Sequence, residues 1–312
     1  MKLEIIGLCK KYKDCIAVNN LSFSIETGEI TGFIGPNGAG KTTTLKIITK
    51  LENSDEGDIK IDGISTLESP YLIRNHIGYV PDFLPTNIDM TVHDYLDFFS
   101  KTYGYKTPER QNIIKELEEF TDIKTVRNNI IDSLSKGMKQ KVSIARALIN
   151  DPDFLILDEP ASELDPRERI ELRNILTILK EQGKGILISS HILSELSEIC
   201  SYAVIIEKGE LLKFGKIEDI IQEVTKNKTR IFKIQTINPP NEEDIKKILL
   251  SPMVSNISAI GNNIEFEFSG SEEQAGELVN NLIVQGIKLS SFGFKQENLE
   301  SVFMNITKGI VQ

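Results

Sequence analysis

Along the first 34 residues, hydrophobic and polar positions alternate, which is the pattern of half-buried β-strands. Leu3 and Ile5 stand two positions apart, and the segment 21–25 repeats this spacing. A Thr-Gly-Glu turn at 27–29 then precedes the run Ile-Thr-Gly-Phe-Ile at 30–34. We expect this last run to be a buried strand that leads into the Gly-rich segment after it.

The middle of the chain changes to the helical period. Apolar residues recur three or four positions apart from Thr91 onward and again after Pro108, which predicts a helical insert over 83–150. The uninterrupted apolar run 154–157 predicts a strand buried on both faces of a parallel sheet. A helix, a strand and a hairpin are expected after it, at 168–182, 185–189 and 203–214.

These patterns predict an α/β domain over residues 1–220, with a mixed sheet, an antiparallel β subdomain and the helical insert. A linker at 221–229 follows. From Arg230 the order is strand, helix, strand, strand, helix, strand, which is the order of a ferredoxin-like α+β unit. With a last helix at 297–308, this smaller domain covers 230–312. Nothing in it looks catalytic, and we expect a regulatory or dimer-stabilising role.

Composition narrows the class of protein. The 312 residues include 36 Lys+Arg and 46 Asp+Glu, and the formal charge of −10 argues against a general nucleic-acid binder. Three cysteines without metal-type spacing favour a reducing cytoplasm over a disulfide framework. No stretch approaches the ~20 apolar residues that span a bilayer, so we expect any membrane function to require a separate membrane protein.

A Gly-rich segment after the strand at 30–34 is the strongest chemical signal. Its glycines allow a tight turn whose N–H groups point inward, and the helix that follows adds positive potential at its start. Lys41 can then reach the β- and γ-phosphates of a nucleotide, and Thr42 can bind Mg²⁺. The predicted phosphate cradle consists of Gly35, Pro36, Asn37, Gly38, Ala39, Gly40, Lys41, Thr42 and Thr43.

A second, acidic site is predicted at the carboxyl end of the strand at 154–157. Ligands of open α/β sheets bind at this edge, so Asp158 is placed to bind Mg²⁺ directly or through water. Glu159 is a candidate general base, or an orienting group, for water that attacks the γ-phosphate. Tyr12, expected in the loop after the first strand, is either a stacking partner for a nucleotide base or an ordinary surface tyrosine.

With these motifs in this order, residues 1 to about 220 resemble the nucleotide-binding subunit of an ATP-binding cassette (ABC) transporter. The resemblance implies that ATP and Mg²⁺ are bound, that Tyr12 stacks on adenine and that 35–43 is the Walker A loop. It also implies that 154–159 is the Walker B segment, with Glu159 as the catalytic residue.

Two further segments gain a role from the same resemblance. Ser162 and Asp165 would belong to a D-loop between subunits, and His191 would be a switch histidine that contacts the γ-phosphate. Two residues near these segments depart from the family pattern. Glu163 takes a D-loop position that is often Gly. Asp82 stands where the Q-loop normally begins with Gln or Glu and is a candidate Mg²⁺ ligand, although its shorter side chain argues against direct contact with the ion.

The segment 134–138, Leu-Ser-Lys-Gly-Met, resembles the family's signature sequence, normally Leu-Ser-Gly-Gly-Gln. In this family it acts across a dimer, where Ser135 and Gly137 would face the γ-phosphate held by the partner's Walker A loop. A helix start with a hydroxyl and a Gly backbone is also an anion site on physical grounds. Lys136 and Met138 replace the usual Gly and Gln, as they often do in the drug-export branch.

Two hypotheses of function follow. In the first, two copies bind ATP at their interface, hydrolyse it and drive a separate membrane permease through the insert, on the inner face of the cell membrane. The ending at 297–303, Glu-Asn-Leu-Glu-Ser-Val-Phe, resembles bacterial exporter subunits of the bacitracin, multidrug and sodium-efflux type and favours export. The alternative is a soluble ABC protein that uses ATP as a regulatory switch. A P-loop kinase or GTPase does not account for the signature segment and His191.

Overall fold

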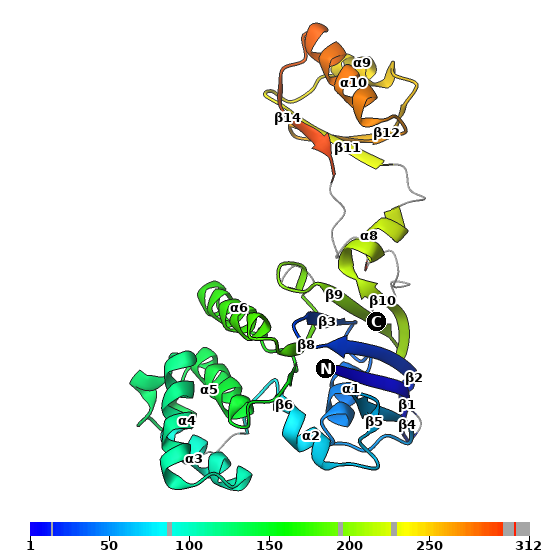
Figure 1. Cartoon of the computed structure of the whole chain (residues 1–312). Coiled ribbons are helices and arrows are strands. Elements are labelled where there is room, and N and C mark those ends of the chain that lie inside the picture. The colour runs from blue at the N-terminus through cyan, green and yellow to red at the C-terminus, as the bar shows by residue number, and fades with distance from the viewer. Residues whose placement is uncertain (14, 86–88, 193–195, 226–229, 296–302, 304–312) are drawn as a thin grey trace. The chain divides into compact units, whose positions relative to one another are not determined.

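The computed structural model describes residues 1–13, 15–85, 89–192, 196–225, 230–295 and 303. These residues fall into two compact units, one covering Met1–Glu218 and a second that begins at Asp219 (Figure 1). The predicted helix at 297–308 lies outside the described residues apart from Phe303, as do residues 226–229 of the predicted linker. Within the described residues, no helix is both long enough and apolar enough to cross a membrane.

The first unit contains two sheets. The larger one comprises β3 (Ile30–Ile34), β6 (Ile77–Val80), β7 (Phe154–Leu157), β8 (Gly185–Ser190), β9 (Tyr202–Glu207) and β10 (Glu210–Lys216). Its strand order is β10-β9-β3-β8-β7-β6, and all neighbours are parallel except β10 and β9. The smaller sheet is antiparallel, in the order β2-β1-β4-β5, and comprises β1 (Lys2–Tyr12), β2 (Cys15–Glu26), β4 (Glu56–Ile61) and β5 (Ile64–Ser65).

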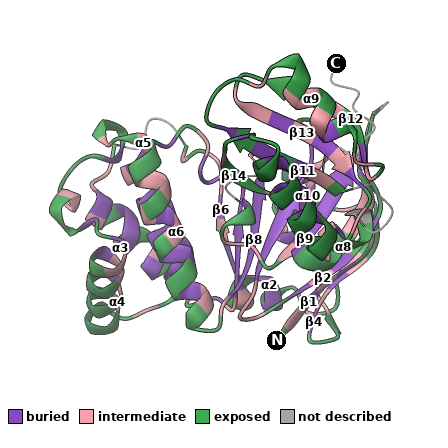
Figure 2. Ribbon diagram, turned by 90° about the horizontal axis from the view of Figure 1, so that it is seen from above, coloured by how far each residue is buried: buried purple, intermediate pink, exposed green. Residues whose placement is uncertain are grey.

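The central strands are buried on both faces, as their uninterrupted apolar runs predict. Every residue of β3, β7 and β8 is buried, and Figure 2 shows strands of this sheet in purple. One hydrophobic core joins both sheets to α1 (Lys41–Ile48), which contributes Leu45, Ile47 and Ile48. This packing fixes the start of α1 against the carboxyl ends of β3 and β7.

Helices α3 (Val92–Tyr103), α4 (Thr107–Phe120) and α5 (Lys136–Leu148) form the predicted helical insert. Two short 3₁₀ turns lie between α4 and α5, at Lys124–Val126 and Ile131–Ser133, and the insert has its own core. Two more helices belong to this unit, α2 (Tyr71–His76) and α6 (Pro166–Glu181). The sequence did not predict α2, because its six residues are too few to display a helical period.

Beyond α8 (Ile217–Thr225), the second unit confirms the ferredoxin-like order. It consists of β11 (Arg230–Thr236), α9 (Glu242–Leu249), β12 (Val254–Ile260), β13 (Asn263–Phe268), α10 (Glu272–Val284) and β14 (Leu289–Phe294). The sheet is antiparallel, in the order β12-β13-β11-β14. Phe232, Ile234 and Phe266 belong to a core that this unit builds from its own residues, so it does not depend on the first unit for burial.

Candidate active site

The Gly-rich segment forms a tight loop between β3 and α1. Gly40, the N-cap of α1, has φ +98°, and a Cβ there would lie 2.2 Å from the carbonyl oxygen of Ala17. A Cβ on Gly35 would lie 2.7 Å from the carbonyl oxygen of Ile206. No side chain caps the start of α1, so its N–H groups and the helix dipole are directed at an anion.

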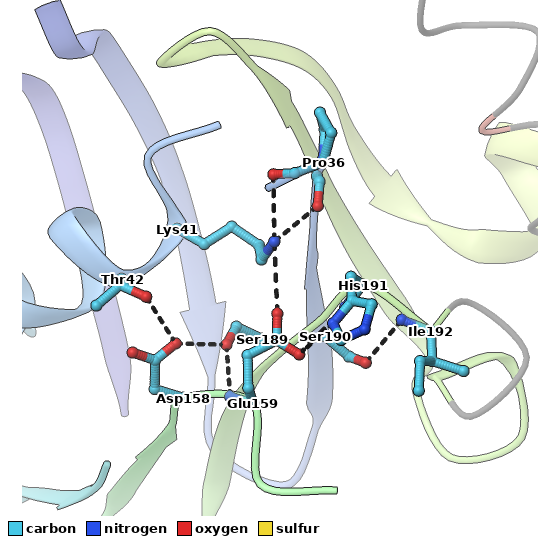
Figure 3. A network of polar contacts seen from close by, with 10 residues as sticks. Pro36, Lys41, Thr42, Asp158, Glu159, Ser189, Ser190, His191 and Ile192 are labelled. Atoms are coloured by element: carbon cyan, nitrogen blue, oxygen red, sulfur yellow. Dashed lines mark hydrogen bonds and ion pairs between the residues drawn. The ribbon is translucent and has the colours of Figure 1, made fainter. Parts of the chain in front are cut away.

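Lys41 occupies the first turn of α1 and is 7% exposed. Its ammonium group donates to the carbonyl oxygens of Gly35, at 2.7 Å, and Pro36, at 3.3 Å. It also lies 3.4 Å from the carboxylate of Glu159, across the loop (Figure 3). A phosphate in this loop would therefore meet a cation whose position is already fixed.

The acidic pair at the end of β7 is organised by a serine that the sequence analysis did not identify. Ser189, at the end of β8, is fully buried, and its hydroxyl donates to Asp158 Oδ1 at 2.8 Å. The same hydroxyl accepts the backbone N–H of Glu159 at 2.8 Å. Thr42 also donates to Asp158 Oδ1, at 3.2 Å, which leaves the lone pairs of the Thr42 hydroxyl for another partner. The signal available in the sequence was a hydroxyl at the end of the next buried strand.

Glu159 lies in a sharp turn, with φ +47°. This left-handed conformation is costly for a residue other than glycine, and the surrounding contacts must hold Glu159 in it. Its Oε2 lies 2.8 Å from His191 Nδ1, and the His191 backbone N–H donates to the same oxygen at 3.3 Å. A carboxylate can only accept, so Nδ1 bears the proton and Nε2 of His191 is available to another ligand.

These residues surround one cavity of about 380 Å³, within the size range of small-molecule sites. Of the predicted residues, it brings together Pro36, Asn37, Gly38, Gly40, Lys41, Thr42, Thr43, Asp82, Glu159, Ser162 and His191. Cys15 and Ala17 of β2 also line it and were not predicted. Asp158 is 3% exposed and reaches the cavity through its contact with Thr42.

Tyr12 lies elsewhere than the sequence analysis expected, which corrects the assignment of a loop. It is the last residue of β1 and pairs with Cys15, because Lys13 adopts the left-handed conformation, with φ 45°, that a tight hairpin turn requires. It does not line the cavity; its ring lies 5.3 Å from the ammonium of Lys10. Stacking of Tyr12 on adenine stays a prediction.

Asp82 contributes a carboxylate to the cavity. Its Oδ1 is buried and has no hydrogen-bond partner among the described residues. Burial raises the pKa of Asp82, the positive charge of Lys136 acts against this, and nearby carboxylates including Asp158 and Glu159 raise it further. A buried carboxylate without a hydrogen-bond partner is strongly stabilised by a cationic ligand.

The signature residues and Asp165 of the D-loop lie outside the cavity, whereas Ser162 of the D-loop lines it. Ser135 is the N-cap of α5, and its oxygen accepts the N–H of Met138 at 3.2 Å. A Cβ on Gly137 would lie 2.1 Å from the Glu168 carboxylate, so the backbone of α5 closely approaches α6. Asp165 is the N-cap of α6 in a capping box with Glu168.

We expect Ser189→Ala to lower the free energy of unfolding by about 1–3 kcal/mol, because a buried acceptor and a buried N–H both lose their partner. Denaturant unfolding measures this loss. Ser54→Ala, at a half-buried serine, is the matched control. An unchanged unfolding free energy in Ser189→Ala would show that water replaces the hydroxyl.

The fold and the cavity together define the class of protein. A buried strand, a Gly-rich loop and an uncapped helix start provide the phosphate cradle of a P-loop nucleoside triphosphatase, and Asp158 and Glu159 follow another buried strand, β7, of the same sheet.

Comparison with known proteins identifies the family. The ABC transporter family matches residues 18–162. YxlF of Bacillus subtilis, an uncharacterized ABC transporter ATP-binding protein, is 33% identical over 306 residues, 97% of this chain and 99% of that protein. Nod factor export ATP-binding protein I of Rhizobium meliloti is 32% identical and covers 98% of this chain and 88% of that protein. This chain belongs to the ATP-binding proteins of ABC transporters.

Solved structures agree with this assignment. The structure of an ATP-binding subunit of an ABC transporter has a TM-score of 0.65 and 30% sequence identity, and the match covers 72% of this chain and 93% of that one. A dimeric bacterial ABC transporter cassette has a TM-score of 0.61 and 26% identity, and covers 69% of this chain and 98% of that one. The ABC ATPase fold expected from the sequence is confirmed.

Proposed function

We propose that this chain hydrolyses ATP and that two copies close around two ATP molecules to drive export through a separate membrane permease. The observation that supports hydrolysis most directly is the position of Glu159, whose carboxylate lies in the phosphate cavity between Lys41 and His191. The dimeric cassette among the similar structures supports pairing. The relatives named for Nod factor export support the direction of transport.

The residues around the cavity fit Mg²⁺. Thr42, Asp158 and Asp82 offer the oxygen ligands that this hard cation prefers, and the buried Asp82 Oδ1 lacks another partner in the described structure. When bound with ATP, Mg²⁺ neutralises charge on the phosphates. Within the described residues, no group of three His, Cys, Asp or Glu side chains could hold a metal, so we expect the phosphates to supply the remaining ligands.

The chain's own residues divide the remaining work. Lys41 and the N–H groups at the start of α1 hold the phosphates. Glu159 accepts a proton from, or orients, the attacking water, while Ser189 fixes its backbone and His191 its carboxylate. In this proposal Ser135 and Gly137 bind the γ-phosphate held by the partner, with Ser162 and Asp165 beside them, and Tyr12 stacks on adenine.

A second cavity supports the proposal that the chain binds a membrane permease. A groove of about 870 Å³ lies among α2, β6, α3 and α5, and is lined by the exposed side chains of Leu51, Leu67 and Phe83. The described residues that line it include four cations and no carboxylate. An apolar groove with a positive lining suits a short apolar segment of a permease that bears an acidic residue. In this proposal the chain lies on the inner face of the membrane.

Affinity purification of the chain from detergent-solubilised membranes tests the proposal. We expect a multi-span protein in near-equal amount. Leu67→Glu, which places a charge in the groove, should reduce its recovery about tenfold or more and leave nucleotide binding unchanged. Ile170→Glu, at an exposed residue of α6, is the matched control. Recovery of no integral membrane protein would instead favour the soluble ATP-switched regulator.

The second unit contains none of the residues named for ATP. We therefore assign it an accessory role outside the ATP site. Loss of nucleotide binding from a folded chain that ends at residue 225 would contradict this assignment.

A further inference from the structure

Three residues that depart from the family pattern lie together in the structure, although they are far apart in the sequence. The ammonium group of Lys136, at the start of α5, lies 2.7 Å from Glu163 Oε2, in the turn before α6. The same ammonium lies 4.4 Å from the centre of the Phe83 ring, and Phe83 directly follows Asp82. Lys136, in its own segment at the start of α5, therefore contacts both the segment that contains Glu163 and the segment that contains Asp82.

The ion pair between Lys136 and Glu163 adds too little to the folding stability of the chain to explain its presence. The Lys136 side chain is 29% exposed and that of Glu163 71%, and an ion pair this close to solvent contributes about 0–1 kcal/mol. Glu163 also adopts φ +59°, which is unfavourable for a residue with a Cβ. Replacing either side chain should leave the chain folded, so the pair is better explained by its effect on local charge.

The local charge is strongly negative. Asp82 and Glu159 line the cavity, and Glu163 directly follows Ser162, which also lines it. Each chain has a net charge of −10, and ATP adds more negative charge. Bringing two such surfaces together around nucleotide is opposed by repulsion between like charges.

We propose that Lys136 is the counter-ion of Glu163, and that this neutralisation allows two copies to close around ATP. The proposal rests on the ATP-driven pairing proposed above. Lys136 acts as a positioning residue through the Glu163 carboxylate and the Phe83 ring. The usual signature has Gly at the position of Lys136. The D-loop position of Glu163 is often Gly as well, so no carboxylate there requires a counter-ion.

A double-mutant cycle tests this proposal in the full chain with Glu159→Gln, which slows hydrolysis. Light scattering gives the ATP concentration for half-maximal dimer in the presence of Mg²⁺. Lys136→Met should raise that concentration about tenfold or more, because Glu163 loses its counter-ion. Glu163→Gln should not raise it, and the double variant should return to within about threefold of the parent. Raising the salt concentration should reduce the Lys136→Met defect, because salt screens repulsion.

Three other outcomes would contradict the proposal, and each points to a different explanation. A double variant as weak as Lys136→Met would overturn the proposal and indicate that Lys136 binds phosphate itself. Equal loss in both single variants, without salt dependence, would overturn it in favour of a mechanical link between α5 and α6. If the parent does not dimerise with ATP, the pairing step of the proposed function fails, and this inference fails with it.

Discussion

Replacing Glu159 by Gln is expected to slow ATP hydrolysis by about 100- to 10,000-fold while ATP binding is retained. The amide has the same shape as the carboxylate but cannot take a proton from water. Lys41 loses an ion pair at 3.4 Å and keeps its two carbonyl partners, so the phosphate cradle stays in place. Because hydrolysis would normally reopen the pair, the variant should also form a longer-lived ATP-dependent dimer.

Phosphate release and light scattering measure these two effects. Glu116→Gln, at an exposed position of α4, makes the same chemical change away from the cavity and should leave the rate unchanged. Near-normal turnover in Glu159→Gln would remove Glu159 from its catalytic role. An unchanged dimer lifetime together with lost turnover would separate hydrolysis from pairing.

Replacing Lys41 by Met is expected to weaken ATP binding about 100-fold, which corresponds to about 2.7 kcal/mol and to the loss of a charge-assisted hydrogen bond. The side chain is buried and held by Gly35 and Pro36, so its ammonium is preorganised for phosphate. Met keeps the length of the side chain and removes the charge.

Equilibrium binding of a fluorescent ATP analogue measures this loss. Lys115→Met, at an exposed position of α4, is the matched control and should bind as the parent does. Binding of the analogue by Lys41→Met with unchanged affinity, in a chain that unfolds at the parent's denaturant concentration, would contradict the phosphate role of Lys41.

The sequence could predict those residues whose chemical role follows from one short, continuous segment of the chain. The Gly-rich loop, Asp158 and Glu159 each follow a run of apolar residues long enough to identify a buried strand. The carboxyl ends of the parallel strands in one sheet meet at the same edge, so these segments could be assigned to one site before the structure was known.

Residues whose role depends on distant partners could not be predicted. Ser189 bridges Asp158 and the backbone of Glu159 only because β8 lies beside β7. Tyr12 was expected in a loop, but hairpin pairing with Cys15 extends β1 to include it. Nothing in the local sequence specifies either arrangement.

Apart from short elements such as α2, the sequence by itself determined the order of the described elements, the family and the positions of the phosphate cradle and acidic pair, because turn chemistry and apolar periodicity are local properties. Only the tertiary structure decided which charges compensate one another. Lys136 and Glu163 are 27 positions apart and meet because Gly137, at the start of α5, lies against the Glu168 side chain at the start of α6. Electrostatic interactions depend on distance in space, and packing alone sets that distance.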